Sequence, residues 1–320
     1  MNGSFNEWNN LDQFLSTNTT QRYLKRCYDR LELSSSSDEL SFNNSYSFIY
    51  YATHGKRHFD LCTHAPLELQ PVLQYYGMVQ LLKCCLLTVD PYYPSSTSLL
   101  AHGVTTRKRK KQNYLFLHDE IKVQRNGLFP YFSEQLFGIK QLEGDKFKMK
   151  DLLVRVPELN NLFNQMTGQS PLAKIYKDGT HFKVNVSILD ALHMTEARFV
   201  QFLKQRFCDE EVAISFNDPF IMIDCKNQPD QLFYQTLDEN WYCPLSREGF
   251  EPFHEVMVHY LLLYNLSMIC RYETEWWGEL FHTFSSNDFP FISRYLTISR
   301  KKVPYMLMQH LENQKKEDGT

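Results

Sequence analysis

Five consecutive cations form the strongest local feature of this 320-residue sequence. Adjacent positive side chains repel one another and cannot all be paired, so the run lies either in water or against an anion. Nearby tyrosines at positions 92, 93 and 114 could stack on bases. Two alternatives therefore stay open: a solvated loop, or a contact to phosphate or nucleic acid made by Arg107, Lys108, Arg109, Lys110 and Lys111.

A second pair of residues has the spacing of a ribonuclease motif. Arg57 and His64 match the pattern R-x6-H. Helical ribonucleases of the HEPN type carry R-x(4–6)-H near a helix start, where the Arg stabilises the charged phosphorane and the His shuttles a proton. The pattern is short and arises by chance, so it supports an alternative hypothesis of metal-independent RNA cleavage by Arg57 and His64.

Histidine spacing does not favour a metal site. His254-Glu255 and His259 resemble H-E-x-x-H, but the two histidines are five residues apart and diverge around a helix. His54 and His58 share a helix face, yet no further ligand of matching spacing accompanies them. We therefore predict no metal and no cofactor.

Arg271 follows a strongly apolar segment and precedes Tyr272, Trp276 and Trp277. A cation at this position complements the negative end of a helix dipole and can stack on an aromatic ring. The functional alternative is an anion-binding Arg in a pocket between two parts of a helical bundle.

Overall composition narrows the class of protein. The net charge of -3 argues against a field over the whole protein that attracts nucleic acid, so any such surface must be local. Eight Cys, no C-x-x-C and a polar N-terminus without an apolar signal segment predict reduced thiols in a cytoplasmic protein. The most apolar run, residues 256–270, is shorter than the roughly 20 residues of a membrane span. It belongs in the centre of a helical bundle.

Periodicity divides the chain into four parts. Helical spacing of apolar residues covers much of 1–33, 45–62 and 66–89, and returns from residue 250. Between these parts, alternation indicates strands at 172–178, 212–216 and 220–225, with a turn at Asn217-Asp218-Pro219. A last helix is expected after Pro304, and residues 34–39 are expected to form a loop.

Several stretches resemble the YaaC family of bacterial proteins. They include NTTQRYL from residue 18, PVLQYYGMVQLLK from residue 71, and LSMICRYETEWW from residue 266. Another runs from Asp90 to Gln112 and contains His102 as well as the basic run. The resemblance implies a cytosolic bacterial protein and directs attention to His102 and Arg271, but it implies no defined activity. It does not clearly extend over residues 172–245.

Together these patterns predict a fold that is mainly α with an α+β insertion, in which N- and C-terminal helices form one bundle. The expected parts are a helical part at 1–94, a mixed region with the basic run at 95–171, a small α+β module at 172–245, and a helical part at 246–320. The expected function is non-enzymatic binding or regulation. Its ligand would be RNA, a nucleotide or another phosphorylated species. The sequence predicts no membrane partner and does not define an oligomeric state.

Overall fold

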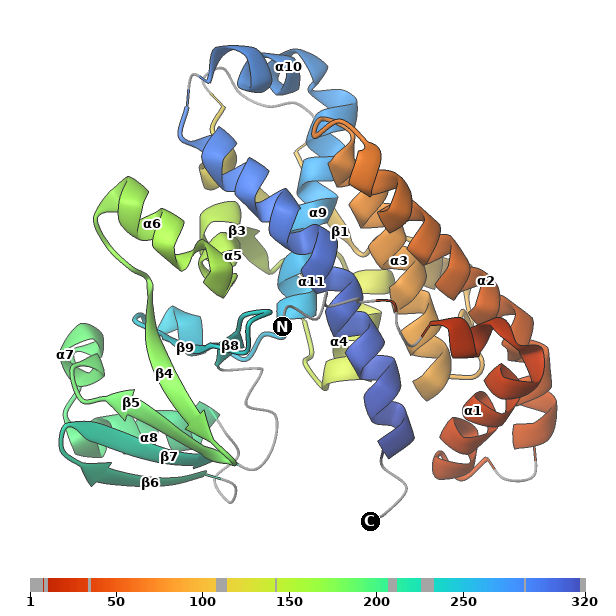
Figure 1. Cartoon of the computed structure of the whole chain (residues 1–320), viewed down its shortest axis with the longest axis horizontal. Helices are drawn as coiled ribbons and strands as arrows, with labels where there is room; N and C mark the ends of the chain where they lie inside the picture. Colours follow the sequence, from red (N-terminus) through yellow and green to blue (C-terminus); the bar gives the residue numbers. More distant parts are fainter. Residues whose placement is uncertain are drawn as a thin grey trace, which may run out of the picture. The chain divides into compact units, whose positions relative to one another are not determined.

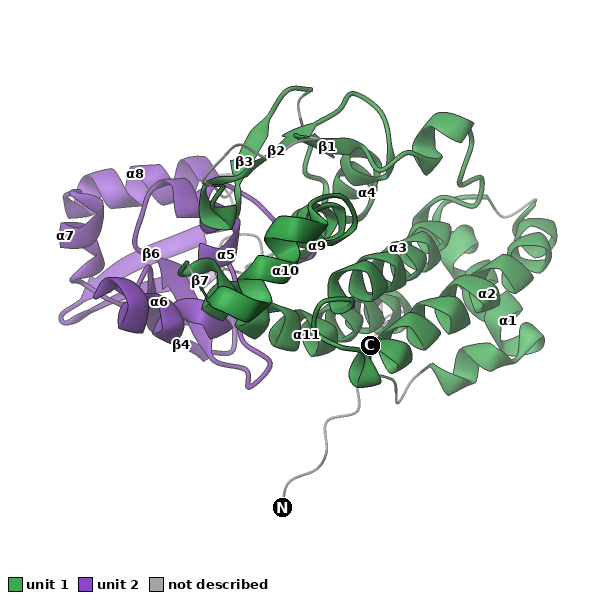
Figure 2. Ribbon diagram, turned by 90° about the horizontal axis from the view of Figure 1, so that it is seen from above, with its two compact units in different colours: residues 1–149, 259–320 green, residues 150–258 purple. Residues whose placement is uncertain are grey.

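The computed structural model describes residues 8, 11–33, 36–107, 114–141, 143–206, 212–225, 233–284 and 286–316. The chain divides into two compact units, coloured separately in Figure 2. Unit 1 combines Met1–Met149 with His259–Thr320, and unit 2 is Lys150–Val258. Unit 2 thus contains the predicted module at 172–245 together with the segments that flank it, and residues 95–149 belong with the helices.

Unit 1 is a helical bundle built from both ends of the chain, as predicted. Its long helices are α1 (Thr17–Arg30), α2 (Ser37–His64), α3 (Gln70–Val89), α9 (Glu255–Tyr272), α10 (Thr274–Thr283) and α11 (Asp288–Lys316). Figure 1 shows α2, α3 and α11 side by side, although α3 ends at Val89 and α11 begins only at Asp288. The hydroxyl of Tyr23 on α1 donates to the Leu311 carbonyl on α11 at 2.9 Å, which ties the two ends together.

The apolar run predicted for the bundle centre is indeed buried. Within unit 1, α9 contributes Tyr260, Leu261, Leu262 and Leu263, each with no exposed surface. At about 25 cal/mol per Å² of apolar surface, full burial of one such Leu stabilises the fold by about 2 kcal/mol. The centre of the bundle is therefore a strong determinant of the fold of unit 1.

Helices α2 and α3 approach closely at two glycines. A Cβ on Gly55 of α2 would lie 2.8 Å from Leu81 of α3, and a Cβ on Gly77 of α3 would lie 2.8 Å from the Phe59 ring of α2. Both distances are shorter than real Cβ contacts. The two glycines thus let the backbones of α2 and α3 approach each other closely.

Two local predictions are corrected. The expected loop at 34–39 is wrong at its end, because Ser37, Asp38 and Glu39 form the first turn of α2, where acidic side chains suit the helix dipole. The last helix does not begin after Pro304, since α11 runs from Asp288 through that proline. Burial of Val303 and Leu307 on either side stabilises α11 where the Pro N–H is missing.

The described residues between 95 and 149, in the predicted mixed region, form a small sheet and a helix. An antiparallel sheet forms from β1 (Val104–Thr106), β2 (Glu120–Val123) and β3 (Lys146–Lys148), accompanied by 3-10 turns at Thr97–Leu100 and Phe116–His118. Helix α4 (Leu128–Phe137) was not predicted, because Pro130 and its aromatic neighbours obscure helical spacing. Gly127 precedes α4, and Gly138 ends it in the left-handed conformation.

Unit 2 is the predicted α+β module with additional helices. Its sheet is antiparallel with strand order β6-β7-β5-β4-β9-β8. The predicted hairpin is confirmed, with Asn217 paired to Phe220 at its turn. The strands are β4 (Leu172–Asp178), β5 (His181–Asn185), β6 (Val212–Asn217), β7 (Phe220–Cys225), β8 (Tyr234–Gln235) and β9 (Trp241–Pro244). The helices are α5 (Met149–Val154), α6 (Asn160–Thr167), α7 (Ile188–Leu192) and α8 (Glu196–Arg206), with 3-10 turns at Pro157–Leu159 and Glu248–Phe250.

One helix of the described chain, α3, is long and apolar enough to cross a membrane by its length and composition alone. Two thirds of its most apolar part, 67%, is buried inside the protein. This burial is typical of a core helix of a soluble protein.

Candidate anion-binding site

The basic run begins where β1 ends. Arg107 directly follows β1 and is exposed, whereas Lys108, Arg109, Lys110 and Lys111 lie outside the described residues. His102 lies just before the same strand, so the short strand β1 connects His102 to the first cation of the run.

The backbone of His102 is held in place by the start of α4. The amide N–H of Leu128 donates to the carbonyl of Ala101 at 2.7 Å, and that of Phe129 donates to the carbonyl of His102 at 3.2 Å. Gly103 and Gly127 both have positive φ and pack backbone against backbone, since a Cβ on Gly127 would lie 2.3 Å from the nitrogen of Gly103. Neither position can accept a side chain without moving the loop.

The imidazole of His102 belongs to a closed chain of hydrogen bonds. Its Nδ1 lies 2.7 Å from the hydroxyl of Tyr75 on α3. The Tyr75 hydroxyl donates to the hydroxyl of Tyr260 on α9 at 3.0 Å. The Tyr260 hydroxyl donates in turn to the carbonyl of His102 at 2.8 Å, which returns to the starting residue.

This chain fixes which ring nitrogen of His102 carries the proton. A carbonyl can only accept, so the single hydroxyl hydrogen of Tyr260 points to it, and Tyr260 must accept from Tyr75. Tyr75 has then used its own hydrogen, so its oxygen accepts from an N–H at Nδ1 of His102. In the neutral ring the other nitrogen, Nε2, is consequently an acceptor.

Nε2 is also accessible. It has no hydrogen-bond partner among the described residues and is not one of the buried unpaired atoms. Burial lowers the pKa of His102 below its usual value of 6.5, and the positive charges of Arg271 and Lys83 lower it further. At neutral pH the ring is therefore uncharged and offers a lone pair to a ligand.

Arg271 brings a guanidinium with open donors to Tyr76, whose ring centroid lies 5.5 Å from that of Tyr75, the hydrogen-bond partner of His102. Its Nε donates to the carbonyl of Ser267 at 2.8 Å, one Nη donates to the hydroxyl of Tyr76 at 3.3 Å, and the other contacts the sulfur of Met268 at 3.3 Å. A guanidinium has five N–H groups, so one on each Nη remains free. Two such N–H groups match two oxygens of a phosphate or carboxylate.

Lys83 supplies the second cation, from α3. Its amine lies 5.5 Å from the centroid of the Tyr51 ring, and burial lowers its pKa. In the part of the chain that the structure describes, neither Lys83 nor Arg271 forms an ion pair with a carboxylate. We call the side chains of Lys83, Arg271, His102 and Tyr76 the His102 site.

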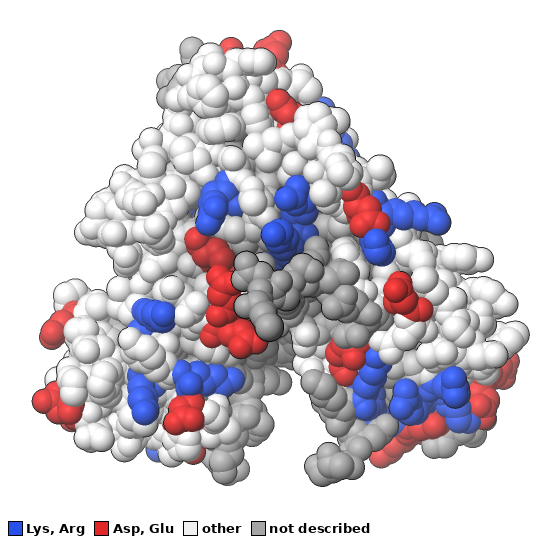
Figure 3. Space-filling model, in the orientation of Figure 1, with Lys and Arg blue, Asp and Glu red and all other residues white. Residues whose placement is uncertain are grey.

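Two half-buried cations without carboxylate partners favour the binding of an anion. Removing a positive charge from water costs free energy unless an opposite charge compensates. On the face drawn in Figure 3, basic side chains lie in small groups beside acidic ones.

The sequence matches one protein family over most of its length. The model of the family described as YaaC-like Protein matches residues 12–311. The chain belongs to the YaaC-like family. No curated protein and no solved structure matches it. The family match spans unit 2 as well, including residues 172–245, where the sequence resemblance was not clear.

The other predicted pair, Arg57 and His64, lies on α2 of this YaaC-like protein. Both side chains are exposed, and their separation of seven residues places them on nearly the same face, about 10.5 Å apart along the axis. The same helix carries His54 and His58, whose rings are 4.6 Å apart. Among the described residues, no three His, Cys, Asp or Glu side chains gather where they could hold a metal ion.

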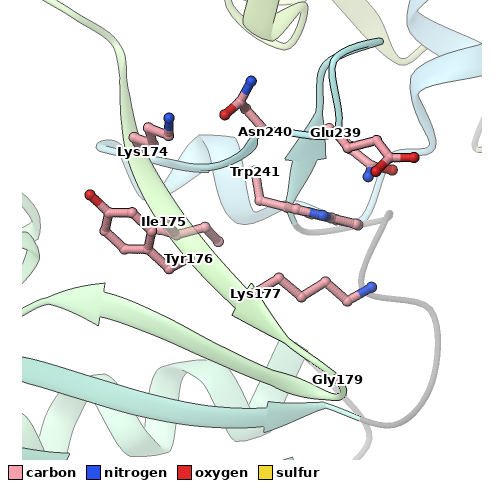
Figure 4. Close-up of a pocket in the computed structure, with 9 residues that line it drawn as sticks. Lys174, Ile175, Tyr176, Lys177, Gly179, Glu239, Asn240 and Trp241 are labelled. Atoms are coloured by element: carbon pink, nitrogen blue, oxygen red, sulfur yellow. The ribbon is translucent and has the colours of Figure 1, made fainter. Parts of the chain in front are cut away.

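Unit 2 of this family member carries a second candidate site. A pocket of about 510 Å³ lies beside β4 and the hairpin of β8 and β9, as Figure 4 shows. Lys177 extends over Trp241, with its amine 4.5 Å from the ring centroid. Lys174 and Lys177 are exposed, and Glu239 shares the lining. These cations are solvated, so this pocket has a weaker demand for an anion than the His102 site.

Sequence reasoning missed half of the His102 site. It identified His102 and Arg271 but not Lys83, Tyr76 or the tyrosines that orient His102. Tyr76 and Lys83 are seven residues apart on α3 and are only partly buried, as is Gln80 between them. A polar stripe at this spacing on a strongly apolar helix was the available signal.

Proposed function

We propose that this protein binds a phosphate-bearing ligand at the His102 site. The observation that carries the proposal is the pair of half-buried cations, Lys83 and Arg271, which lack a carboxylate partner in the described chain. Arg271 contacts Tyr76, whose ring lies beside that of Tyr75, the hydrogen-bond partner of His102. Phosphate oxygens would accept the two free N–H groups of Arg271 and compensate the charge of Lys83. Exposed aromatic surface beside Arg271, on Tyr272, could stack on a base.

The basic run extends the proposal toward RNA or a nucleotide. Arg107 lies five residues after His102, and the sequence places four further cations directly behind it. Cations in such number add salt-dependent affinity for each phosphate contacted. We therefore include RNA, a nucleotide or another phosphorylated compound as ligands, and we propose a cytoplasmic bacterial protein. Free thiols support this compartment, since the described cysteines Cys27, Cys62, Cys84, Cys85, Cys243 and Cys270 are unpaired.

Calorimetric titration with adenosine monophosphate, at low and at physiological salt, tests the proposal. We expect Arg271→Ala and Lys83→Ala each to weaken binding about tenfold or more, because each removes a charge-assisted contact. Lys56→Ala is the matched control, since the Lys56 amine is already paired with Asp60 at 2.6 Å. Binding by the wild-type protein that neither site variant weakens would refute the proposed site.

A second candidate function is metal-independent RNA cleavage by Arg57 and His64. The observation that favours it is their exposure on one face of α2. A His that acts as general acid and base and an Arg that stabilises the charged phosphorane need no metal ion to cleave RNA. The expected result is cleavage that persists in EDTA and is lost in His64→Ala. Cleavage that this variant retains would exclude His64 as the proton-transfer group.

A further inference from the structure

The hydrogen-bond chain around His102 limits which phosphorylated ligand fits. Nδ1 carries the proton and is engaged with Tyr75, so the ring offers the ligand only a lone pair at Nε2. A phosphate group presents mainly acceptor oxygens, which have no hydrogen to donate to a lone pair. The group that meets Nε2 must instead be a donor, such as a hydroxyl.

We propose that the ligand is a ribonucleotide, whose phosphate lies against Arg271 and Lys83 and whose ribose hydroxyl donates to Nε2 of His102. The inference rests on the proposed function and adds the sugar to it. His102 thereby selects ribose over deoxyribose, because the deoxy sugar leaves Nε2 without a donor. The 2′-hydroxyl is the group by which proteins distinguish RNA from DNA.

Three groups around the site agree with the parts of a ribonucleotide. The hydrogen bonds that the Arg271 guanidinium makes all go to neutral groups, so its charge remains for the phosphate. The lone pair at Nε2 of His102 suits the hydroxyl of a sugar. Tyr272, whose side chain is 64% exposed, stacks on the Arg271 guanidinium at 5.3 Å and keeps aromatic surface for the base. A free ribonucleotide and the end of an RNA strand share this chemistry.

Two substitutions of His102 separate its two nitrogens. In His102→Asn the side-chain amide reaches the position of Nδ1 and can still donate to Tyr75, but nothing occupies the position of Nε2. In His102→Gln the amide reaches the position of Nε2, where its carbonyl oxygen can accept. Thermal melting checks that both variants fold, and the comparison of the two removes effects common to any change of His102.

The experiment titrates each protein with adenosine monophosphate, its 2′-deoxy and 3′-deoxy analogues, ribose 5-phosphate and inorganic phosphate. Oligoadenylate and oligodeoxyadenylate form the polymer arm. We expect the wild-type protein to prefer the ribose form about tenfold over at least one deoxy analogue, the effect of one lost hydrogen bond. The preference should vanish in His102→Asn and persist at least in part in His102→Gln.

The outcomes separate the inference from the proposed function. Equal affinity for ribose and deoxyribose forms in the wild-type protein, with binding that Arg271→Ala weakens, overturns the inference and leaves phosphate binding intact. A ribose preference that survives in His102→Asn also overturns it. If no phosphorylated probe binds the wild-type protein, both fail. Tighter binding of oligoadenylate than of the mononucleotide identifies RNA as the source of the ribonucleotide.

Discussion

The protonation state of His102 follows from the number of hydrogens on its two tyrosine neighbours. Each tyrosine hydroxyl has one hydrogen, and both hydrogens are directed around the ring toward the His102 carbonyl. Nδ1 must then supply the third hydrogen. A side chain oriented in this way loses little freedom when a ligand arrives, which favours binding.

Nitrogen-15 NMR can test this orientation directly. We expect the ligand-free protein at pH 7 to show His102 as the neutral tautomer with hydrogen on Nδ1, titrating below pH 6.5 because burial and the charges of Arg271 and Lys83 lower its pKa. Between this lowered pKa and about pH 6.5, the folded state binds fewer protons at His102 than the unfolded chain does. The contribution of His102 to the stability of the fold is therefore complete above about pH 6.5. That contribution decreases as the pH falls toward the lowered pKa.

Tyr75→Phe is the informative comparison for the same spectra. It removes the oxygen that accepts from Nδ1 and should allow both tautomers to be populated. A wild-type spectrum with hydrogen on Nε2 would contradict the chain of donors. A pKa of His102 at or above 6.5 would contradict its burial beside two cations.

At the scale of elements, the distance between α2 and α3 is set by Gly55 and Gly77. Gly77→Ala should destabilise the protein by about 1–3 kcal/mol, since its Cβ would meet the Phe59 ring at 2.8 Å and force the core to move. The same movement displaces Tyr76 and Lys83, so ligand affinity should fall as well. Chemical denaturation and calorimetric titration measure the two effects.

Gly278→Ala is the matched control for Gly77→Ala. Gly278 lies inside α10, and a Cβ there would meet nothing within 4 Å. Alanine in place of glycine within a helix should stabilise the protein by about 0.5–1 kcal/mol. If both substitutions shifted stability in the same direction and by the same amount, the close approach at Gly77 would not explain the effect.

The sequence predicts elements whose turns and periodicity lie in neighbouring residues. It does not predict bounds and sites that are set by contacts between residues far apart in the chain. Alternation and Asn217-Asp218-Pro219 predicted the hairpin of β6 and β7, because a turn and its two strands are neighbours in sequence. The helical start of α2 at Ser37 and the path of α11 through Pro304 depend on packing, which overrides local preference. The His102 site belongs to the second class, since His102 meets Tyr75 and Tyr260 from 27 and 158 residues away.

At the scale of the whole molecule, the chain divides into two units, and the His102 site is built from residues of unit 1 alone. Every residue of the site lies in Met1–Met149 or His259–Thr320. Unit 2 has a core of its own, in which Phe182, Ile221 and Ile223 have no exposed surface. Compact units with separate cores can respond separately to substitution.

Phe182→Ala tests this separation. Phe182 contacts Phe233 and Trp241, with ring centroids 4.8 and 5.2 Å away, so its removal leaves a cavity in the core of unit 2. We expect unit 2 to lose about 3–5 kcal/mol of its free energy of unfolding. Hydrogen exchange of the amides within Lys150–Val258 measures this loss. Affinity for adenosine monophosphate should stay within twofold of wild type below the temperature at which unit 2 melts. A large loss of affinity in the still-folded variant would mean that unit 2 takes part in binding, because the His102 site itself is unchanged by the substitution.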